Sequence, residues 1–282
     1  MNGKRTSLVI SRALSYALLI FLVAMCLIPF VVLLINATRN HADIQRGFSF
    51  VPSSQFFVNL KNLMNDPNLP VLRGILNSLT VSGLTALCAT YFSALTAYAI
   101  HAYDFRLRKI AYSFILMVMI VPTQVSALGF LRMMVRLNWA NSFWPLILPA
   151  IASPVVFFFM KQYMEAVLPV EVVEASRIDG AGEFFTFNRI VLPMMKPAIA
   201  VQAIFTFVSS WNNFFMPALL LKSQDKKTLP LLIAQLRSAD FMKFDMGKVY
   251  MMITVAIVPI LIVYLFLSKF IVRGVTLGSV KG

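Results

Sequence analysis

The chain has 282 residues, of which 59% are hydrophobic and 13% are charged, and its mean hydropathy is +0.80. Soluble domains are closer to half apolar and a quarter charged, so this composition indicates an integral membrane protein. The formal charge of +14 comes from basic residues scattered singly at the edges of apolar runs. Such cations suit lipid headgroups, and their scatter argues against a nucleic-acid-binding surface. We expect one membrane domain that covers residues 1–282.

Six apolar stretches are long enough to cross a bilayer, which takes about 20 residues per helix. They lie near 13–36, 75–100, 109–130, 143–165, 195–221 and 249–271. The first stretch follows Lys4 and Arg5 as a secretory signal would, but its apolar core is too long and lacks a cleavage site. We therefore expect an all-α polytopic protein with six transmembrane helices, a first span at 13–36 and a core over 75–272.

The basic residues give weak support for a cytoplasmic N-terminus. With that orientation the inside segments hold 13 Lys and Arg and the outside segments hold 12. Short segments near span ends carry most weight in this rule, and residues 1–10 and 101–109 favour the inside. An even number of spans would then place the C-terminus in the cytoplasm as well.

Two of the outside segments have recognisable patterns. Residues 37–74 contain Asn, Asp and Pro without a long apolar period, which predicts an ordered loop with short helical pieces. Residues 131–139 place apolar side chains at helical spacing, which predicts a helix at the bilayer surface.

The sequence offers no catalytic or metal-binding set. The two cysteines and the two histidines stand alone, without the further ligands of a metal site. The phosphate-binding sequence GxxxxGK[ST] is absent, and no Ser/His/Asp or Cys/His set can be assigned to nucleophilic catalysis. We therefore expect a chain that binds no metal or cofactor and is not an enzyme.

A polar interruption separates the fourth and fifth apolar stretches. Five of the 11 acidic residues fall within 19 residues: Glu165, Glu171, Glu174, Asp179 and Glu183. Together with Arg177 and Arg189 they would cost on the order of 20 kcal/mol at a bilayer centre, so this segment must lie outside the lipid.

The interruption, which contains EASRIDGAGEFFTFNRIVLP at 174–193, has helical order. The spacing of four residues places them on one face of a helix: Glu174, Ile178, Ala181 and Phe185. Glu174 can pair with Arg177, Gly180 is placed to end the helix in a left-handed conformation, and Pro193 can kink a second helix. The pattern predicts helix, glycine turn, helix, which an ordinary elbow between two spans would also satisfy.

This segment resembles the EAA motif in the membrane subunits of ABC importers. The motif runs Glu-Ala-Ala, three residues, Gly, nine residues, Ile, one residue, Leu-Pro, and the matching positions are Glu174, Ala175, Ser176, Gly180, Ile190, Leu192 and Pro193. Ser176 in place of the second alanine is the one departure. NSLTVSGLTAL, MIVPTQ, SWNNFFMPALLL and VRGVTLGSVKG elsewhere in the chain are similar to carbohydrate-type permeases, in particular the shorter permease of maltose or multiple-sugar importers.

The resemblance implies a type I ABC importer fold in which residues 166–193 form the coupling loop. Glu174, Ala175 and Ser176 would dock on an ATP-binding subunit, with Glu174 paired to a basic residue, while Gly180 and Ala181 allow the turn and close approach. It also implies a second related permease, two ATP-binding subunits that use ATP and Mg, and an extracytoplasmic sugar-binding protein. The loop at 222–248 would meet that binding protein or serve as a solvated connector. The C-terminal VRGVTLGSVKG would reach into the interface between the ATPase subunits or form a short disordered end.

Polar residues inside the spans are candidates for the translocation path. They are Trp211, Asn212 and Asn213 in the fifth span and Gln124 in the third. Amide groups and aromatic faces suit sugars, although hydrogen bonds between helices would explain the same residues. A permease for glycerol phosphate or another small polar solute is the alternative within the family. An ATP-independent carrier is the alternative outside it, although such carriers more often contain broken helices or intramembrane charges.

Overall fold

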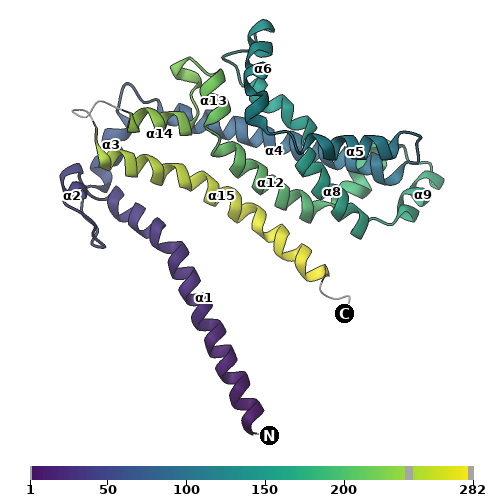
Figure 1. Ribbon diagram of the computed structural model, residues 1–282, viewed down its shortest axis with the longest axis horizontal. Helices are drawn as coiled ribbons and strands as arrows, with labels where there is room; N and C mark the ends of the chain where they lie inside the picture. Colours follow the sequence, from purple (N-terminus) through teal and green to yellow (C-terminus); the bar gives the residue numbers. More distant parts are fainter. Residues whose placement is uncertain (1, 239–243, 279–282) are drawn as a thin grey trace. The chain divides into compact units, whose positions relative to one another are not determined.

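The computed structural model describes the backbone of residues 2–238 and 244–278 and the side chains of residues 10–238 and 244–270. Helices make up the regular structure in the described backbone (Figure 1). Four of them are long and apolar enough to cross a membrane: Ile10–Ala37, Val71–Ala102, Trp144–Val167 and Met246–Phe270. Two further helix pairs meet the same test together but are bent, and the number of candidate spans reaches six if each bent pair counts as one span. The expected all-α polytopic fold is confirmed.

The third apolar stretch differs from the straight span expected at 109–130. Helix α5 (Arg108–Val118) and helix α6 (Thr123–Arg136) are separated by a break and meet at 96°. Pro122 stands directly before α6, and because proline has no backbone N–H it cannot continue the hydrogen bonding of α5. Residues 131–136 of the helix expected at 131–139 form the second half of α6, and residues 137–139 lie beyond its end.

The fifth apolar stretch is also interrupted. Helix α12 (Lys196–Trp211) is bent by 80° against the segment Glu183–Met194, and Met195 stands at the corner. Prolines at 193 and 197 flank this corner, as the sequence predicted for Pro193. At its other end α12 stops at Trp211, and a short helix, α13 (Phe215–Leu220), follows.

The chain divides into two compact units, of which the first comprises Met1–Leu69 and Ile233–Ile257. It contains α1 (Asn2–Ala37), α2 (His41–Gln45), α3 (Phe56–Met64), and parts of α14 (Leu229–Arg237) and α15 (Met246–Gly278). The buried Asn59 amide donates to the carbonyl oxygens of Ala37 and Arg39, both at 2.9 Å. Lys248 Nζ lies 3.0 Å from Asp66 Oδ2. The ordered loop with short helices predicted for 37–74 is confirmed.

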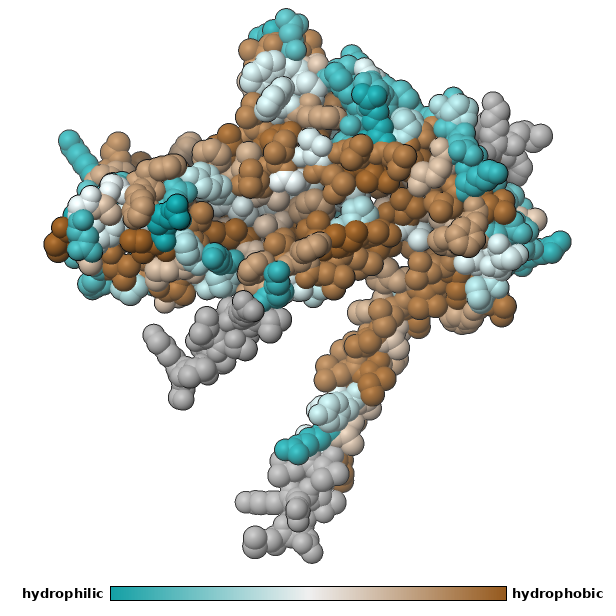
Figure 2. Space-filling model, turned by 180° about the vertical axis from the view of Figure 1, so that it is seen from behind, coloured by the Kyte–Doolittle hydropathy of each residue, from teal (hydrophilic) through white to brown (hydrophobic). Residues whose placement is uncertain are grey.

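Helix α1 has almost no packing partner in this unit. Its most hydrophobic 18-residue window has no buried side chain, and hydrophobic residues cover most of its described length in Figure 2, with hydrophilic residues toward its N-terminal end. An exposed apolar surface of this size needs lipid or another protein against it.

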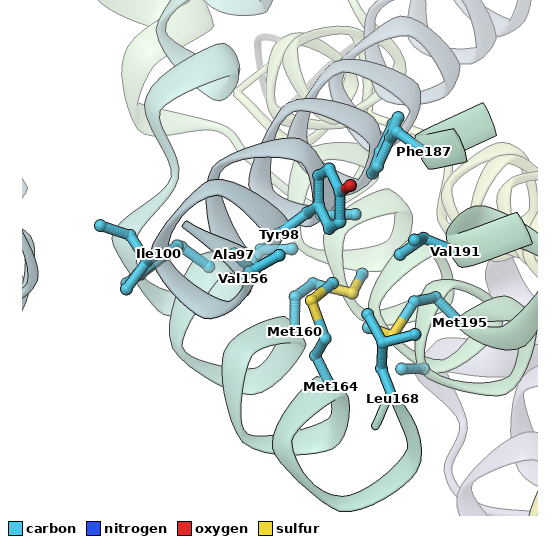
Figure 3. Packing of buried hydrophobic residues seen from close by; sticks show 14 of the residues in the cluster. Ala97, Tyr98, Ile100, Val156, Met160, Met164, Leu168, Phe187, Val191 and Met195 are labelled. Carbon is cyan, nitrogen blue, oxygen red and sulfur yellow. The ribbon is translucent and has the colours of Figure 1, made fainter. Parts of the chain in front are cut away.

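The second unit comprises Pro70–Leu232 and Val258–Gly282. Its centre is α4 (Val71–Ala102), which packs against α12 and against α8 (Pro154–Val167). Figure 3 shows the buried cluster that joins them, where Met160 and Met164 of α8 meet Tyr98 of α4, with Phe187 and Val191 close by. The segment after the acidic interruption is therefore fixed to the helix core of this unit.

Candidate functional site

The acidic interruption forms helix, turn and helix, as predicted. Helix α9 spans Val170–Ile178 and begins after Pro169, and α10 spans Glu183–Thr186. A π-helical turn, Phe187–Val191, and the short α11, Leu192–Met194, continue it to the corner at Met195.

The turn between the two helices is set by Gly180, which has φ = +79°. Its N–H donates to the Arg177 carbonyl and the Ala181 N–H donates to the Ser176 carbonyl, both at 3.0 Å. These two bonds form the Schellman motif, which satisfies the last carbonyls of α9. A Cβ at Gly180 would meet no atom within 4 Å, so glycine is required here for its backbone conformation rather than for space within this chain.

A buried pair of hydroxyl groups joins the two helices beneath the turn. Ser176 Oγ and Thr186 Oγ1 lie 2.7 Å apart, and both residues are buried. Ser176 is the position at which the EAA pattern has its second alanine. The serine in place of alanine at position 176 therefore has a local explanation. Alanine would leave the Thr186 hydroxyl without this partner.

The carboxylate of Glu183 gathers three donors from two parts of the chain. Arg177 Nε donates to Oε1 at 2.7 Å, Tyr98 OH donates to Oε2 at 3.0 Å, and Tyr103 OH also donates to Oε2. The Arg177 guanidinium additionally stands 5.1 Å from the centre of the Tyr103 ring. We call Tyr98, Tyr103, Arg177 and Glu183 the carboxylate clasp. It ties α9 and α10 to the end of α4.

The clasp keeps its members in fixed charge states near neutral pH. The hydrogen bond to Glu183 raises the pKa of the Arg177 guanidinium, which stays charged. Burial, followed by the hydrogen bond to the Glu183 carboxylate, raises the pKa of the Tyr103 phenol, which stays neutral and remains a donor.

The expected pairing of Arg177 with Glu174 is wrong, because the turn brings Glu183 to Arg177 instead. The helix face predicted to run from Glu174 to Phe185 is also interrupted. Helix α9 ends at Ile178, and Ala181 lies beyond the turn. Glu174 and Ala175 are exposed on α9. Large apolar side chains stand exposed around them: Ile178 (86% exposed), Phe184 (72%) and Phe185 (56%). A protruding element with an acid and three exposed apolar residues has the composition of a docking surface.

The four residues predicted to line the translocation path have different surroundings in the structure. Asn213 lines a cavity of about 320 Å³ in the second unit. Trp211 is buried and stacks on Phe207, with ring centres 5.6 Å apart, so it belongs to the core. Asn212 and Gln124 are exposed and do not line this cavity.

This cavity, which we call the polar cavity, lies at the breaks after α12 and before α6. Half of its 14 lining residues are apolar, and the other half carry hydroxyl or amide side chains: Ser78, Ser82, Thr123, Ser126, Ser210, Asn213 and Thr228. None of the described residues that line it is charged. The hydroxyl groups of Ser82 and Thr228 are buried and have no hydrogen-bond partner among the described residues. A buried hydroxyl without a partner is costly, so these two groups are unsatisfied polar atoms on residues that line the cavity.

Sequence reasoning did not find the carboxylate clasp or the grouping of serines around the polar cavity. Tyr98 and Glu183 are 85 residues apart, and no local pattern links them. The side chains of the C-terminal VRGVTLGSVKG lie outside the described residues, as do residues 239–243 of the loop at 222–248.

Up to six candidate spans, with a polar helix, turn and helix between α8 and α12, define a polytopic membrane protein. Residues 89–277 match the family described as the binding-protein-dependent transport system inner membrane component. The chain is 34% identical over 262 residues to the arabinooligosaccharides transport system permease protein AraQ of Bacillus subtilis, covering 91% of each chain. It is 27% identical to the trehalose/maltose transport system permease protein MalG of Thermococcus litoralis, covering 97% of this chain and 98% of that protein.

A solved bacterial ABC transporter involved in the import of the acidic polysaccharide alginate contains a chain of the same fold. The TM-score is 0.78 at 20% identity, over 91% of this chain and 95% of that chain. The chain thus belongs to the family of inner-membrane components of binding-protein-dependent transport systems. It is a transport subunit rather than an enzyme, like the permeases that it resembles.

Proposed function

We propose that this chain is one permease of an ATP-driven, binding-protein-dependent importer of oligosaccharides. It pairs with a second related permease, and two separate ATP-binding subunits supply the ATP and Mg chemistry. An extracytoplasmic sugar-binding protein delivers the cargo. The chain itself carries no cofactor, lies in the cytoplasmic or inner membrane, and has both termini in the cytoplasm.

The observation that carries this proposal is the docking element at residues 170–186. Its acid and exposed apolar residues protrude, while Val173, Ser176 and Thr186 beneath them are buried. The carboxylate clasp ties the element to α4, so a force applied to α9 reaches a membrane helix through hydrogen bonds and packing. Glu174, Ala175, Ser176, Gly180 and Ala181 are the proposed coupling residues, with Glu174 meeting a basic groove on the ATPase subunit.

The polar cavity supports a neutral cargo. Sugars present hydroxyl groups and apolar C–H faces, and the cavity combines serine and threonine hydroxyls with Phe130 and three prolines. Glycerol phosphate, the alternative cargo, would bring a charge that no described residue of this cavity offsets. The named cargoes of the relatives, arabinooligosaccharides and trehalose/maltose, agree with this preference.

Uptake by the complete complex in proteoliposomes tests the coupling role. Glu174→Lys and Gly180→Pro should abolish ATP-driven uptake while the amount of this chain in the membrane is unchanged. Glu171→Lys, which changes another exposed acid of α9, is the matched control and should retain most uptake. Normal uptake by both Glu174→Lys and Gly180→Pro would refute the coupling assignment.

Cargo is tested with labelled oligosaccharides beside labelled glycerol phosphate. Ser82→Ala and Thr228→Val should each reduce oligosaccharide uptake about fivefold, the value of one lost hydrogen bond. Thr80→Val, on the exposed side of α4, is the control and should have little effect. Transport of the phosphate ester without the sugars would refute the choice of cargo.

A further inference from the structure

A second cavity, of about 750 Å³, lies on the side of the second unit that carries the coupling loop. The end of α4, the connection to α5, the start of α5 and the end of α8 surround it. Its charged lining consists of Arg106, Arg108, Lys109, Lys161, Asp104 and Glu165. We call it the basic cavity. Four cations and two acids give its lining a formal charge of +2.

One of these cations is buried. The Lys161 side chain is only 6% exposed, and its ammonium group pairs with Glu165 and stands 5.9 Å from the centre of the Tyr112 ring. A buried ammonium group is costly even when it is paired. The carboxylate of Glu165 is itself 47% exposed, and three more cations line the same cavity. An anion in the cavity would offset the repulsion among these cations.

The position of the basic cavity indicates where the anion comes from. Candidate spans end at Ala102 and Val167, so the cavity lies at the depth of the lipid headgroups. Helix α5 starts in the wall of the cavity and has no buried residue. It exposes Ile110, Phe114 and Met117, at 65%, 63% and 65%, along one apolar stripe. A charged recess beside an exposed apolar helix offers separate surfaces to a phosphate group and to acyl chains.

We propose that the basic cavity binds the headgroup phosphate of an anionic phospholipid, with Arg106 and Lys109 as accessible cations and Lys161 at its buried end. The lipid would fix the start of α5 to the end of α8, beside the coupling loop. The inference relies on the proposed function only for the placement of the bilayer. Neither the coupling residues nor the polar cavity contributes to this site.

The test measures lipid retained by the complete complex. Complexes are assembled in nanodiscs of phosphatidylglycerol and phosphatidylcholine, extracted in mild detergent, and examined by native mass spectrometry. The double variant Arg106→Gln/Lys109→Gln should retain about tenfold less phosphatidylglycerol, with no change in phosphatidylcholine. Both residues are exposed, so the chain should fold normally. The double variant Arg106→Lys/Lys109→Arg should restore retention.

Lys196→Gln is the matched control, because Lys196 is an exposed cation at the start of α12 and does not line the basic cavity. Retention should stay within about twofold of wild type in this variant. Equal retention in the wild type and in Arg106→Gln/Lys109→Gln would overturn the proposal, as would equal loss in Lys196→Gln.

Two further outcomes would assign the basic cavity to another occupant and would equally overturn the proposal. Binding of inorganic phosphate by a wild-type complex that retains no phosphatidylglycerol would indicate a free anion. Loss of the ATPase subunits from the Arg106→Gln/Lys109→Gln complex, with lipid retention intact, would indicate a protein contact. Lipid retention is measured without transport, so its result is independent of whether the coupling-loop variants abolish uptake.

Discussion

Replacing Glu183 by alanine removes the acceptor that holds the carboxylate clasp together. Tyr98, Tyr103 and Arg177 all donate to this carboxylate. After loss of Glu183, helix α9 keeps its turn at Gly180 and its buried side chains but loses its polar connection to α4. The variant should therefore loosen the segment 170–186 without unfolding the membrane domain.

The size of the effect follows from the exposure of the partners. Each phenol bond contributes about 1 kcal/mol. The ion pair contributes about 0.5 kcal/mol, because the Arg177 and Glu183 side chains are 35% and 44% exposed and solvent screens them. The total is about 2–3 kcal/mol, which corresponds to a change of about 30- to 150-fold in the opening equilibrium of the loop.

Hydrogen exchange of the α9 amides, measured on the complex in nanodiscs, reports this opening equilibrium directly. Glu183→Ala should lower protection in α9 by the factor given above and leave α4 and α8 unchanged. Tyr98→Phe should account for about 1 kcal/mol of the loss. Glu171→Ala removes an exposed acid of the same helix and serves as the control. If α9 exchanged at the wild-type rate in Glu183→Ala, the clasp would not hold the loop and the reasoning would fail.

Gly180→Ala should cost about 1 kcal/mol, because alanine is unfavourable at positive φ, and should lower α9 protection about fivefold. Gly83→Ala, within a helix and with open space around it, should be neutral or stabilising, and an equal loss in both variants would contradict this account. Ser176→Ala should destabilise the loop by about 1 kcal/mol by leaving a buried hydroxyl unpaired. Adding Thr186→Val should recover most of that loss, which thermal unfolding of the detergent-solubilised complex can measure, and an additive loss would count against the pairing.

The sequence by itself determined the features that depend on neighbouring residues. The free energy of transfer from water into the bilayer is a property of each side chain. The apolar stretches could therefore be identified from the sequence alone. The turn at Gly180 follows from backbone sterics at one residue, and the end of α9 needed nothing more distant. Pro193 indicated a break because proline inside a helix removes a backbone hydrogen bond. The EAA spacing, being local, could be matched in the same way.

Only the tertiary structure decided how these pieces meet. Proline predicts a break but no angle, so the bends of 96° and 80° come from packing against the rest of the second unit. Several acids lie near Arg177 along the chain, and the folded turn selects Glu183. Helix packing brings Tyr98 to that carboxylate across 85 residues, and it also gathers the serines of the polar cavity and buries Trp211. Contacts of this kind depend on which helix faces meet, and no local pattern in the sequence encodes them.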